Sequence, residues 1–385
     1  MNPDIFRNST AGQMIRVGQG EAAHWAFAPN PLPPALPFDA ELVHTLSEAD
    51  RALGELAGLG RTLSNPNILI QPFIRREAVL SSRIEGTQAS IADVYAYEAQ
   101  LSHKTTPPNS DVREVVNYVR ALEYGLKRLE TLPLSLRLLR EMHGRLMEGI
   151  HGEAAQPGEF RHTQNWIGRP GCTLVEASFV PPPPTEMLTA LNTLEQYLHA
   201  EDTYPPLFRL VFIHYQFEAI HPFIDGNGRM GRLLLTLLLV KWNLLPTPLL
   251  YLSAYFERQR EAYYAQLLAV SERGTWHDWT LFCLRGITEQ AHDANTRAKR
   301  LQDLQAQWRR KIQKSRSAGL LLGIIDQLFE HPFITTADVQ TRFGVAHPTV
   351  MRALRKLEAQ QIVSESSGQY HHQIYVAQAI LDIVQ

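Results

Sequence analysis

An apolar run that directly follows a glycine-rich loop constrains the fold of this chain most. Residues 229–242, RMGRLLLTLLLVKW, are apolar almost all round a helix, and such a helix is stable only when other elements enclose it. The uninterrupted run at 233–240 is far shorter than the roughly 18 residues that span a bilayer. The stretch therefore predicts a buried central helix in a mainly α-helical, globular protein.

Composition narrows the class of protein further. The 385 residues carry a formal net charge of -2, so the molecule as a whole has no electrostatic attraction to nucleic acid or acidic lipid. Only Cys172 and Cys283 are present, without the spacing of a zinc site or a disulfide scaffold. The N-terminus lacks the apolar core of a signal peptide. We therefore expect a cytoplasmic protein with no membrane partner.

Changes in pattern divide the chain into four segments. Residues 1–103 begin with a proline-rich stretch, which predicts an extended arm, and continue as helices. Residues 104–287 form a helical body, interrupted at 151–184 by β-prone runs around GRPG that predict a short hairpin. Residues 288–317 are polar and basic, which predicts a solvent-exposed connecting helix. Residues 318–385 form a small separate module.

The stretch HPFIDGNGRMGR at 221–232 combines the parts of a phosphoryl- or nucleotidyl-transfer site. Gly226 to Gly228 begin a helix, where free N–H groups and the helix dipole attract anions. Arg229 and Arg232 lie on one face of its first turn, so both can reach the same polyanion. Asp225 can hold Mg²⁺ shared with phosphates. His221, with an ordinary pKa near 6.5, can accept a proton.

This stretch resembles the signature of the Fic family, HxFx(D/E)GNGRxxR, at every fixed position. The resemblance covers about 65–285 and implies that 104–287 is a Fic-type catalytic core that transfers AMP from ATP to a protein Ser, Thr or Tyr hydroxyl. Glycine at 228, where phosphate-transferring members have lysine, favours AMP transfer. The matching residues are His221, Phe223, Asp225, Gly226, Asn227, Gly228, Arg229 and Arg232.

The same resemblance implies a role for each residue. His221 would take the hydroxyl proton, and Asp225 would bind Mg²⁺ on the α- and β-phosphates. Gly226 to Gly228 with Arg229 would hold those phosphates, and Arg232 the γ-phosphate. Phe223 would anchor the loop in the core. By the same resemblance, Tyr263 and Tyr264 would pack on adenine; a position in the core is the alternative for each of them.

The hexapeptide SSRIEG at 81–86 resembles the family's inhibitory motif, (S/T)xxxE(G/N). Ser81 and Glu85 are four residues apart and so share one helix face, and Gly86 also fits a helix stop. The resemblance implies that Glu85 pairs with Arg232, so that ATP binds in a pose unfit for attack. The enzyme would then be autoinhibited by a helix of its own N-terminal segment. The same glutamate could instead position a water for removing AMP from a target.

Residues 318–385 resemble a winged helix-turn-helix module. After a second HPFI at 331–334, Thr335 or Thr336 caps one helix, Gly344 ends it, Pro348 opens the next, and two short strands follow. Four basic side chains against six acidic ones give this module a net charge of -2, which disfavours DNA binding. Dimerisation or docking of a target is therefore favoured over DNA as its role.

Several alternatives remain open from the residues alone. A target segment could add to the hairpin at 151–184 by main-chain pairing, which reveals nothing about the identity of that protein. Nothing in the phosphate site reads the base, so transfer of UMP or phosphocholine is also possible. A DNA-binding regulator with a nucleotide-sensing body is the alternative from another class. His221 and Asp225 favour the enzyme, because a sensor needs neither of them.

Overall fold

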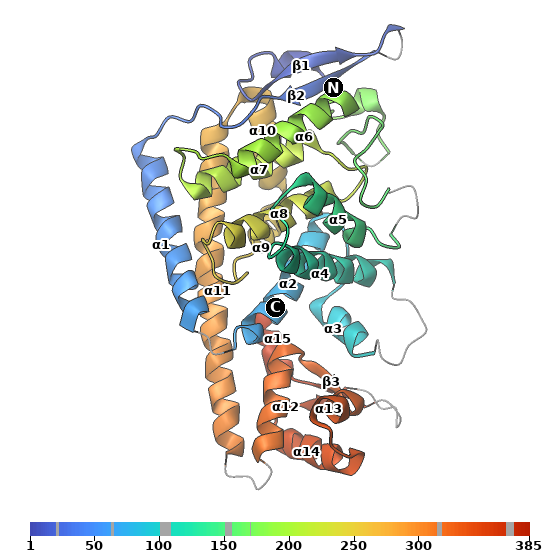
Figure 1. Ribbon diagram of the computed structural model, residues 1–385, viewed down its shortest axis with the longest axis vertical. Helices are drawn as coiled ribbons and strands as arrows, with labels where there is room; N and C mark the ends of the chain where they lie inside the picture. Colours follow the sequence, from blue (N-terminus) through green and yellow to red (C-terminus); the bar gives the residue numbers. More distant parts are fainter. Residues whose placement is uncertain are drawn as a thin grey trace.

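A computed structural model describes residues 1–20, 23–62, 65–100, 109–150, 156–169, 171–313, 318–366 and 373–385. The molecule is elongated, with a small hairpin at one end, a helical body in the middle and the C-terminal module at the other end (Figure 1). The mainly α-helical fold expected from the sequence is confirmed. In the described ranges, no helix is both long and apolar enough to cross a membrane.

The apolar run forms the central helix that its pattern predicts. Helix α8 (Asn227–Lys241) is buried over almost its whole length and packs against three helices of the body. Burying one leucine side chain contributes about 1.5–3 kcal/mol, so the leucines at 233–235 and 237–239 make this helix the centre of the core. Its neighbours are α2 (Asn67–Ile84), α4 (Ser110–Arg128) and α7 (Pro206–Ile220).

The remaining helices of the body surround this centre. The segment 253–273 has one helical pattern in the sequence but forms two helices, because the backbone leaves helical geometry at Gln259. The surrounding helices of the body are α1 (Ala40–Thr62), α3 (Ile91–Gln100), α5 (Leu136–Leu146), α6 (Pro184–His199), α9 (Ser253–Arg258) and α10 (Arg260–Arg273).

The expected connecting helix at 288–317 is part of a much longer element. Helix α11 (Trp276–Ile312) runs without a break from the body to the C-terminal module, beside α1 (Figure 1). The expected solvent exposure holds for only one face of this helix, because small and apolar residues spaced among the charges bury the opposite face. The expected boundary at 317/318 falls beside residues 314–317, outside the described ranges. The buried residues on the inner face of α11 include Ala291, Ala294, Ala298, Leu301, Trp308 and Ile312.

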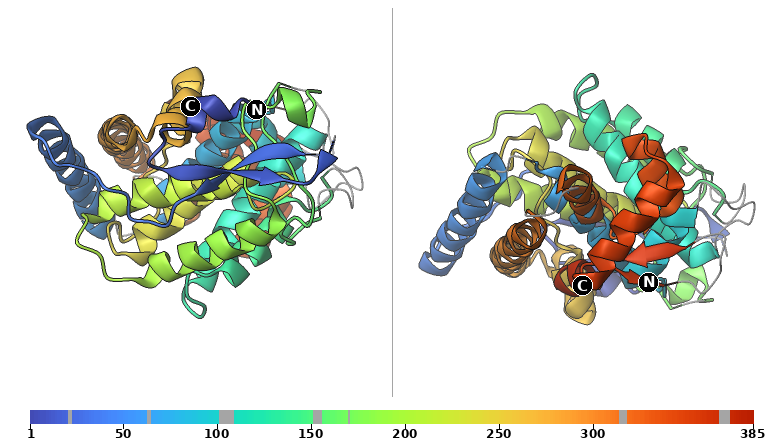
Figure 2. Two further views of the ribbon diagram at one scale, coloured as in Figure 1. Left: turned by 90° about the horizontal axis from the view of Figure 1, so that it is seen from above. Right: turned by 90° about the horizontal axis from the view of Figure 1, so that it is seen from below.

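The N-terminal arm contains a β-hairpin that the sequence did not predict, whereas its proline-rich part, 30–39, forms neither helix nor strand, as expected. Strands β1 (Gly12–Val17) and β2 (His24–Pro29) pair antiparallel and lie across one end of the body (Figure 2). A short 3₁₀ helix precedes them (Pro3–Phe6). The Phe27 N–H donates to Val180 O at 2.8 Å, and the rings of Phe6, Phe27 and Phe179 form one aromatic cluster. The N-terminal hairpin therefore packs against the chain at Phe179 and Val180.

The predicted hairpin at 151–184 is largely irregular in the described residues. One antiparallel bridge joins Ile167 to Phe179, and a 3₁₀ turn (Leu174–Glu176) lies between them. Residues 151–155 and Pro170 of the expected GRPG turn lie outside the described ranges. We call residues 156–182 the flap. Buried prolines at its end prevent a regular ladder, because proline lacks an N–H to donate.

The C-terminal module contains the two helices and two strands in the order that its sequence predicts, and also α12, β3 and α15, which the sequence did not predict. The Thr335 side chain caps α13 and Gly344 ends it in the left-handed region, at φ 64°. The strand pairing order is β3-β5-β4, and the Ser-Gly turn expected between the last two strands lies in the undescribed 367–372. The elements are α12 (Ala318–Glu330), β3 (Phe333–Thr335), α13 (Thr336–Phe343), α14 (His347–Ala359), β4 (Ser364–Glu365), β5 (Ile374–Val376) and α15 (Gln378–Val384).

Candidate active site

The loop between α7 and α8 carries the motif and has a fixed shape. His221 ends α7 in the left-handed region at φ 50°, and Gly226 precedes α8 at φ 80°, a value that glycine adopts without steric cost. The side chain of Asn227 clamps the loop, since it accepts from Phe223 N–H and donates to Phe223 O, both at 2.8 Å. The Phe223 ring is fully buried, as its expected anchoring role requires.

His221 lies at the start of this loop as a neutral imidazole. Its Nδ1 is 3.4 Å from Glu218 O, so a proton on Nδ1 leaves Nε2 as the atom that can accept another. Burial lowers the pKa of His221 to about 4, and the positive charge of Arg161 acts in the same direction. The side chain is therefore unprotonated at neutral pH, as a general base must be.

Asp225 offers an accessible carboxylate beside the helix N-terminus. Its side chain is 44% exposed, with Oδ2 3.6 Å from Arg229 Nη2, and Oδ1 accepts from Gly226 N–H at 2.6 Å. Among the described residues, no group of three or more His, Cys, Asp or Glu side chains is placed to hold a metal. One carboxylate completed by substrate phosphates and water is a binding mode that suits Mg²⁺. The donor set thus fits an ion that arrives with a nucleotide.

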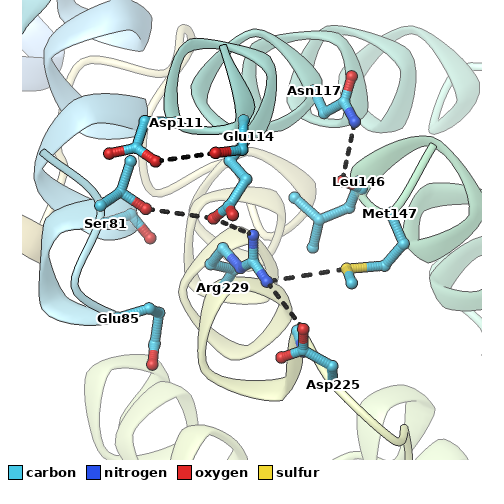
Figure 3. Close-up of polar contacts among 12 residues, drawn as sticks. Ser81, Glu85, Asp111, Glu114, Asn117, Leu146, Met147, Asp225 and Arg229 are labelled. Atoms are coloured by element: carbon cyan, nitrogen blue, oxygen red, sulfur yellow. Dashed lines mark hydrogen bonds and ion pairs between the residues drawn. The ribbon is translucent and has the colours of Figure 1, made fainter. Parts of the chain in front are cut away.

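Arg229 is buried in an ion pair that the sequence did not predict. Its Nη1 donates to Glu114 Oε2 at 2.9 Å, and the same oxygen accepts from Thr87 Oγ1 at 3.1 Å. Figure 3 shows the guanidinium between Glu114, Met147 and Asp225, with its Nη2 3.8 Å from the Met147 sulfur. Glu114 is 115 residues from Arg229 along the chain. No local pattern could have found it.

Arg232 contacts Ser81 and Glu85, the two polar residues at the fixed positions of the motif at 81–86. Its Nη2 donates to Glu85 Oε1 at 2.6 Å and to Ser81 O at 3.0 Å, and its Nε donates to Ser81 Oγ at 2.8 Å. Gly86 follows the end of α2 with φ 106°, where other residues are strained. Arg232 Nη1 is buried without a partner among the described residues. That N–H has almost no accessible surface, so a ligand could reach it only after a neighbouring side chain moves.

Gly228 leaves room for this ion pair. A Cβ placed on Gly228 would lie 2.4 Å from Glu85 Oε1 and 3.0 Å from Arg232 Nη1, distances at which one of the two side chains has to move. Any residue larger than glycine at this position would therefore disturb the contact between α2 and α8.

The two tyrosines have different surroundings. Tyr263 is 1% exposed, stacks on Phe256, and its hydroxyl lies 2.9 Å from His214 Nε2. Tyr263 thus lies in the core, the second of the two positions that the sequence left open, and this burial does not support a contact of its ring with adenine. Tyr264 is 41% exposed and is the member of the pair that a ligand can reach.

His143 of α5 contacts the loop between α7 and α8, a role that the sequence analysis did not predict. Its Nδ1 accepts from Gly158 N–H at 2.9 Å, so Nε2 carries the proton that faces Asp225 O at 3.0 Å. The ring stacks on Phe223 with a centroid distance of 3.7 Å. Burial lowers the pKa of His143 to about 4. The neutral ring with one defined tautomer holds the loop from α5.

Comparison with protein families identifies two matching regions. Residues 43–127 match the family model described as Fic/DOC family N-terminal, which includes the inhibitory motif and Glu114. Residues 133–239 match the model of the Fic/DOC family, which includes the whole loop and most of α8.

Named relatives and solved structures agree with this. The chain is 28% identical over 183 residues to the protein adenylyltransferase Fic of Drosophila grimshawi and 27% identical to that of Drosophila melanogaster; the match covers 47% of this chain but only 34% and 33% of theirs. The crystal structure of a Fic family protein from Desulfovibrio desulfuricans superposes on 90% of this chain and 98% of its own, with a TM-score of 0.57 at 21% identity. Fic-1 from C. elegans gives a TM-score of 0.53 at 21% identity, over 67% of this chain and 72% of its own. At these identities the structures support the fold.

Proposed function

Because the chain belongs to the Fic/DOC family, we propose that it transfers AMP from ATP to a Ser, Thr or Tyr hydroxyl of a protein. One observation carries the proposal. A neutral His221, an exposed carboxylate and a helix N-terminus with two arginines are held on a single rigid loop. The curated relatives are named adenylyltransferases, which favours AMP over the other groups that the phosphate site admits.

The chemical step follows from the position of His221. Its Nε2 accepts the proton of the target hydroxyl while that oxygen attacks the α-phosphorus of ATP. A new P–O bond forms to the target, and the bond from the α-phosphorus to the bridging oxygen breaks. Pyrophosphate leaves with that electron pair. General-base assistance of this kind contributes on the order of 10²- to 10⁴-fold.

The anion site would hold the phosphates of ATP. The N–H groups that begin α8 are not satisfied within the helix and attract phosphate oxygens. Arg229 supplies a second donor and the unpartnered Nη1 of Arg232 a third. Asp225 would hold Mg²⁺, which neutralises charge on the phosphates and on the departing pyrophosphate.

We further propose that Glu85 inhibits this reaction. In the structure it engages Arg232 Nη2, so this arginine cannot give both Nη groups to the γ-phosphate. A nucleotide would then bind with its α-phosphate displaced, and a shift of about 1 Å can reduce the rate about a hundredfold. Glu85 is 33% exposed at its side chain, so it can leave Arg232 without unfolding α2.

Intact-mass measurement of three proteins with ATP and Mg²⁺ tests both proposals. Glu85→Gly should gain one or more AMP units by self-modification, about tenfold or more faster than wild type. Glu85→Gly/His221→Ala should gain none. A gain of phosphate alone would replace AMP transfer by a kinase reaction. If Glu85→Gly modifies neither itself nor added candidate proteins and does not bind ATP, the proposed function is wrong.

For the C-terminal module we propose a winged helix-turn-helix fold that docks a protein. Support comes from its element order and its three-stranded sheet, together with its net charge of -2. Fluorescence anisotropy with duplex DNA at low and high salt tests the alternative. Binding that weakens steeply with salt would assign the module to DNA instead.

A further inference from the structure

Arg161 is a buried arginine that makes only hydrogen bonds to backbone carbonyls. Arg161 is 1% exposed, and no carboxylate among the described residues lies within ion-pair distance of its guanidinium. Its Nε donates to His221 O at 2.9 Å, Nη1 to Thr163 O at 3.1 Å, and Nη2 to Ile220 O at 3.4 Å and also to Pro182 O. Burial lowers the pKa of Arg161 to about 10, so it is charged at neutral pH. A buried charge of this kind is costly unless its donors are satisfied.

The four carbonyls belong to three parts of the active site. Thr163 and Pro182 lie on the two limbs of the flap, and Ile220 and His221 end α7. The backbone N–H of Arg161 also donates to Pro222 O at 2.9 Å. One planar guanidinium thereby joins both limbs of the flap to the residue that carries the base. Lysine has three donors on a single atom and cannot span these positions.

We propose that Arg161 is a positioning residue, which fixes the backbone of His221 relative to the flap so that a hydroxyl held by the flap meets the imidazole. The proposal depends on the function proposed above. His221 has a left-handed backbone at the end of a helix, where the carbonyls at 220 and 221 lack helical partners. Arg161 satisfies both of them, so its loss frees the orientation of this residue.

The phosphate site does not depend on these contacts. Gly226 to Gly228, Arg229 and Arg232 are held by the Asn227 clamp, Glu114 and α2. Loss of Arg161 should therefore reduce transfer without reducing ATP affinity. A residue with only a structural role would affect both together, or neither.

The experiment uses the full chain in the Glu85→Gly background. Arg161→Met removes the charge and all donors, Arg161→Lys keeps the charge, and Arg140→Met is the matched control. Arg140 also donates to a carbonyl at the start of the flap, Gly158 O, but not to the catalytic loop. ATP affinity is measured by calorimetry, and AMP transfer by single-turnover intact mass.

We expect Arg161→Met and Arg161→Lys to bind ATP within about twofold of Glu85→Gly and to transfer AMP at least tenfold more slowly. Arg140→Met should match Glu85→Gly in both measurements. Transfer within twofold in a folded Arg161→Met protein overturns the inference, as does an equal loss of ATP affinity. If Arg161→Met does not fold, Arg161→Lys decides by the same two criteria. Absence of transfer in Glu85→Gly itself would instead contradict the proposed function.

Discussion

At the scale of the residue, the proposed chemistry depends on the protonation state of His221. His221 is neutral because burial and the Arg161 charge both oppose the imidazolium ion, which lowers its pKa to about 4. The ordinary histidine pKa is about 6.5. The base is therefore available over a wider pH range than an exposed histidine would be.

The rate of AMP transfer should report this shift. With a lowered pKa, His221 stays unprotonated as the pH falls from 8 to 6, and protonation removes the base only as the pH approaches about 4. Single-turnover transfer by Glu85→Gly should thus be flat between pH 6 and 8. An acidic limb centred near pH 6.5 would contradict this expectation. Far-ultraviolet circular dichroism at each pH serves as the control for folding.

At the scale of the element, the end of α2 and the residues after it are linked to both arginines of the loop, to Arg232 directly and to Arg229 through Glu114. Glu85 pairs with Arg232 directly. Thr87 donates to Glu114, which in turn accepts from Arg229. The segment that we propose to be inhibitory is therefore attached to the site at two points, and the motif in the sequence accounts for only one of them.

Thr87→Val should weaken the second attachment. The substitution keeps the shape of the side chain but removes its donor to a carboxylate, a hydrogen bond that typically contributes about 1.5–3 kcal/mol. We expect self-modification to rise about twofold to tenfold, less than in Glu85→Gly. Ser82→Ala is the control, because Ser82 Oγ is buried near the end of α2 without a partner among the described residues. Equal rates in Thr87→Val and wild type would limit the inhibition to Glu85.

At the scale of the whole molecule, α2 lies between the site and the C-terminal module. Helices α12 and α15 pack against it. Nearby, the Tyr95 ring stacks on Phe333 with centroids 6.1 Å apart, and Asn65 Nδ2 donates to Glu330 Oε1 at 3.4 Å. Anything that binds the module can therefore act on the helix that carries Glu85.

Phe333→Ala should loosen this docking. Phe333 is half-buried, so we expect a loss of about 1–2 kcal/mol, below the cost for a fully buried ring. Hydrogen exchange should become faster in α2 and α3 but not in α8. Arg355→Ala, an exposed change on α14, is the control. Equal exchange rates of α2 and α3 in the Phe333→Ala protein and in wild type would show that the module is not coupled to α2.

The sequence by itself determined the features that depend on neighbours along the chain. The apolar run required a buried central helix, and the motif placed His221, Asp225 and the glycines on the short loop that joins α7 to the N-terminus of α8. The family resemblance also predicted the pair of Glu85 and Arg232, because both belong to motifs with fixed spacing. Their contact distance of 2.6 Å agrees.

Only the tertiary structure decided the contacts that join distant segments. Glu114 contacts Arg229 across 115 residues of sequence. His143 contacts Asp225 across 82 residues, and Arg161 contacts His221 across 60 residues. Each of these side chains looks like an ordinary charged or polar helix or loop residue in its own segment. Local periodicity reports which face of an element is buried, whereas the partner on that face depends on how the helices pack.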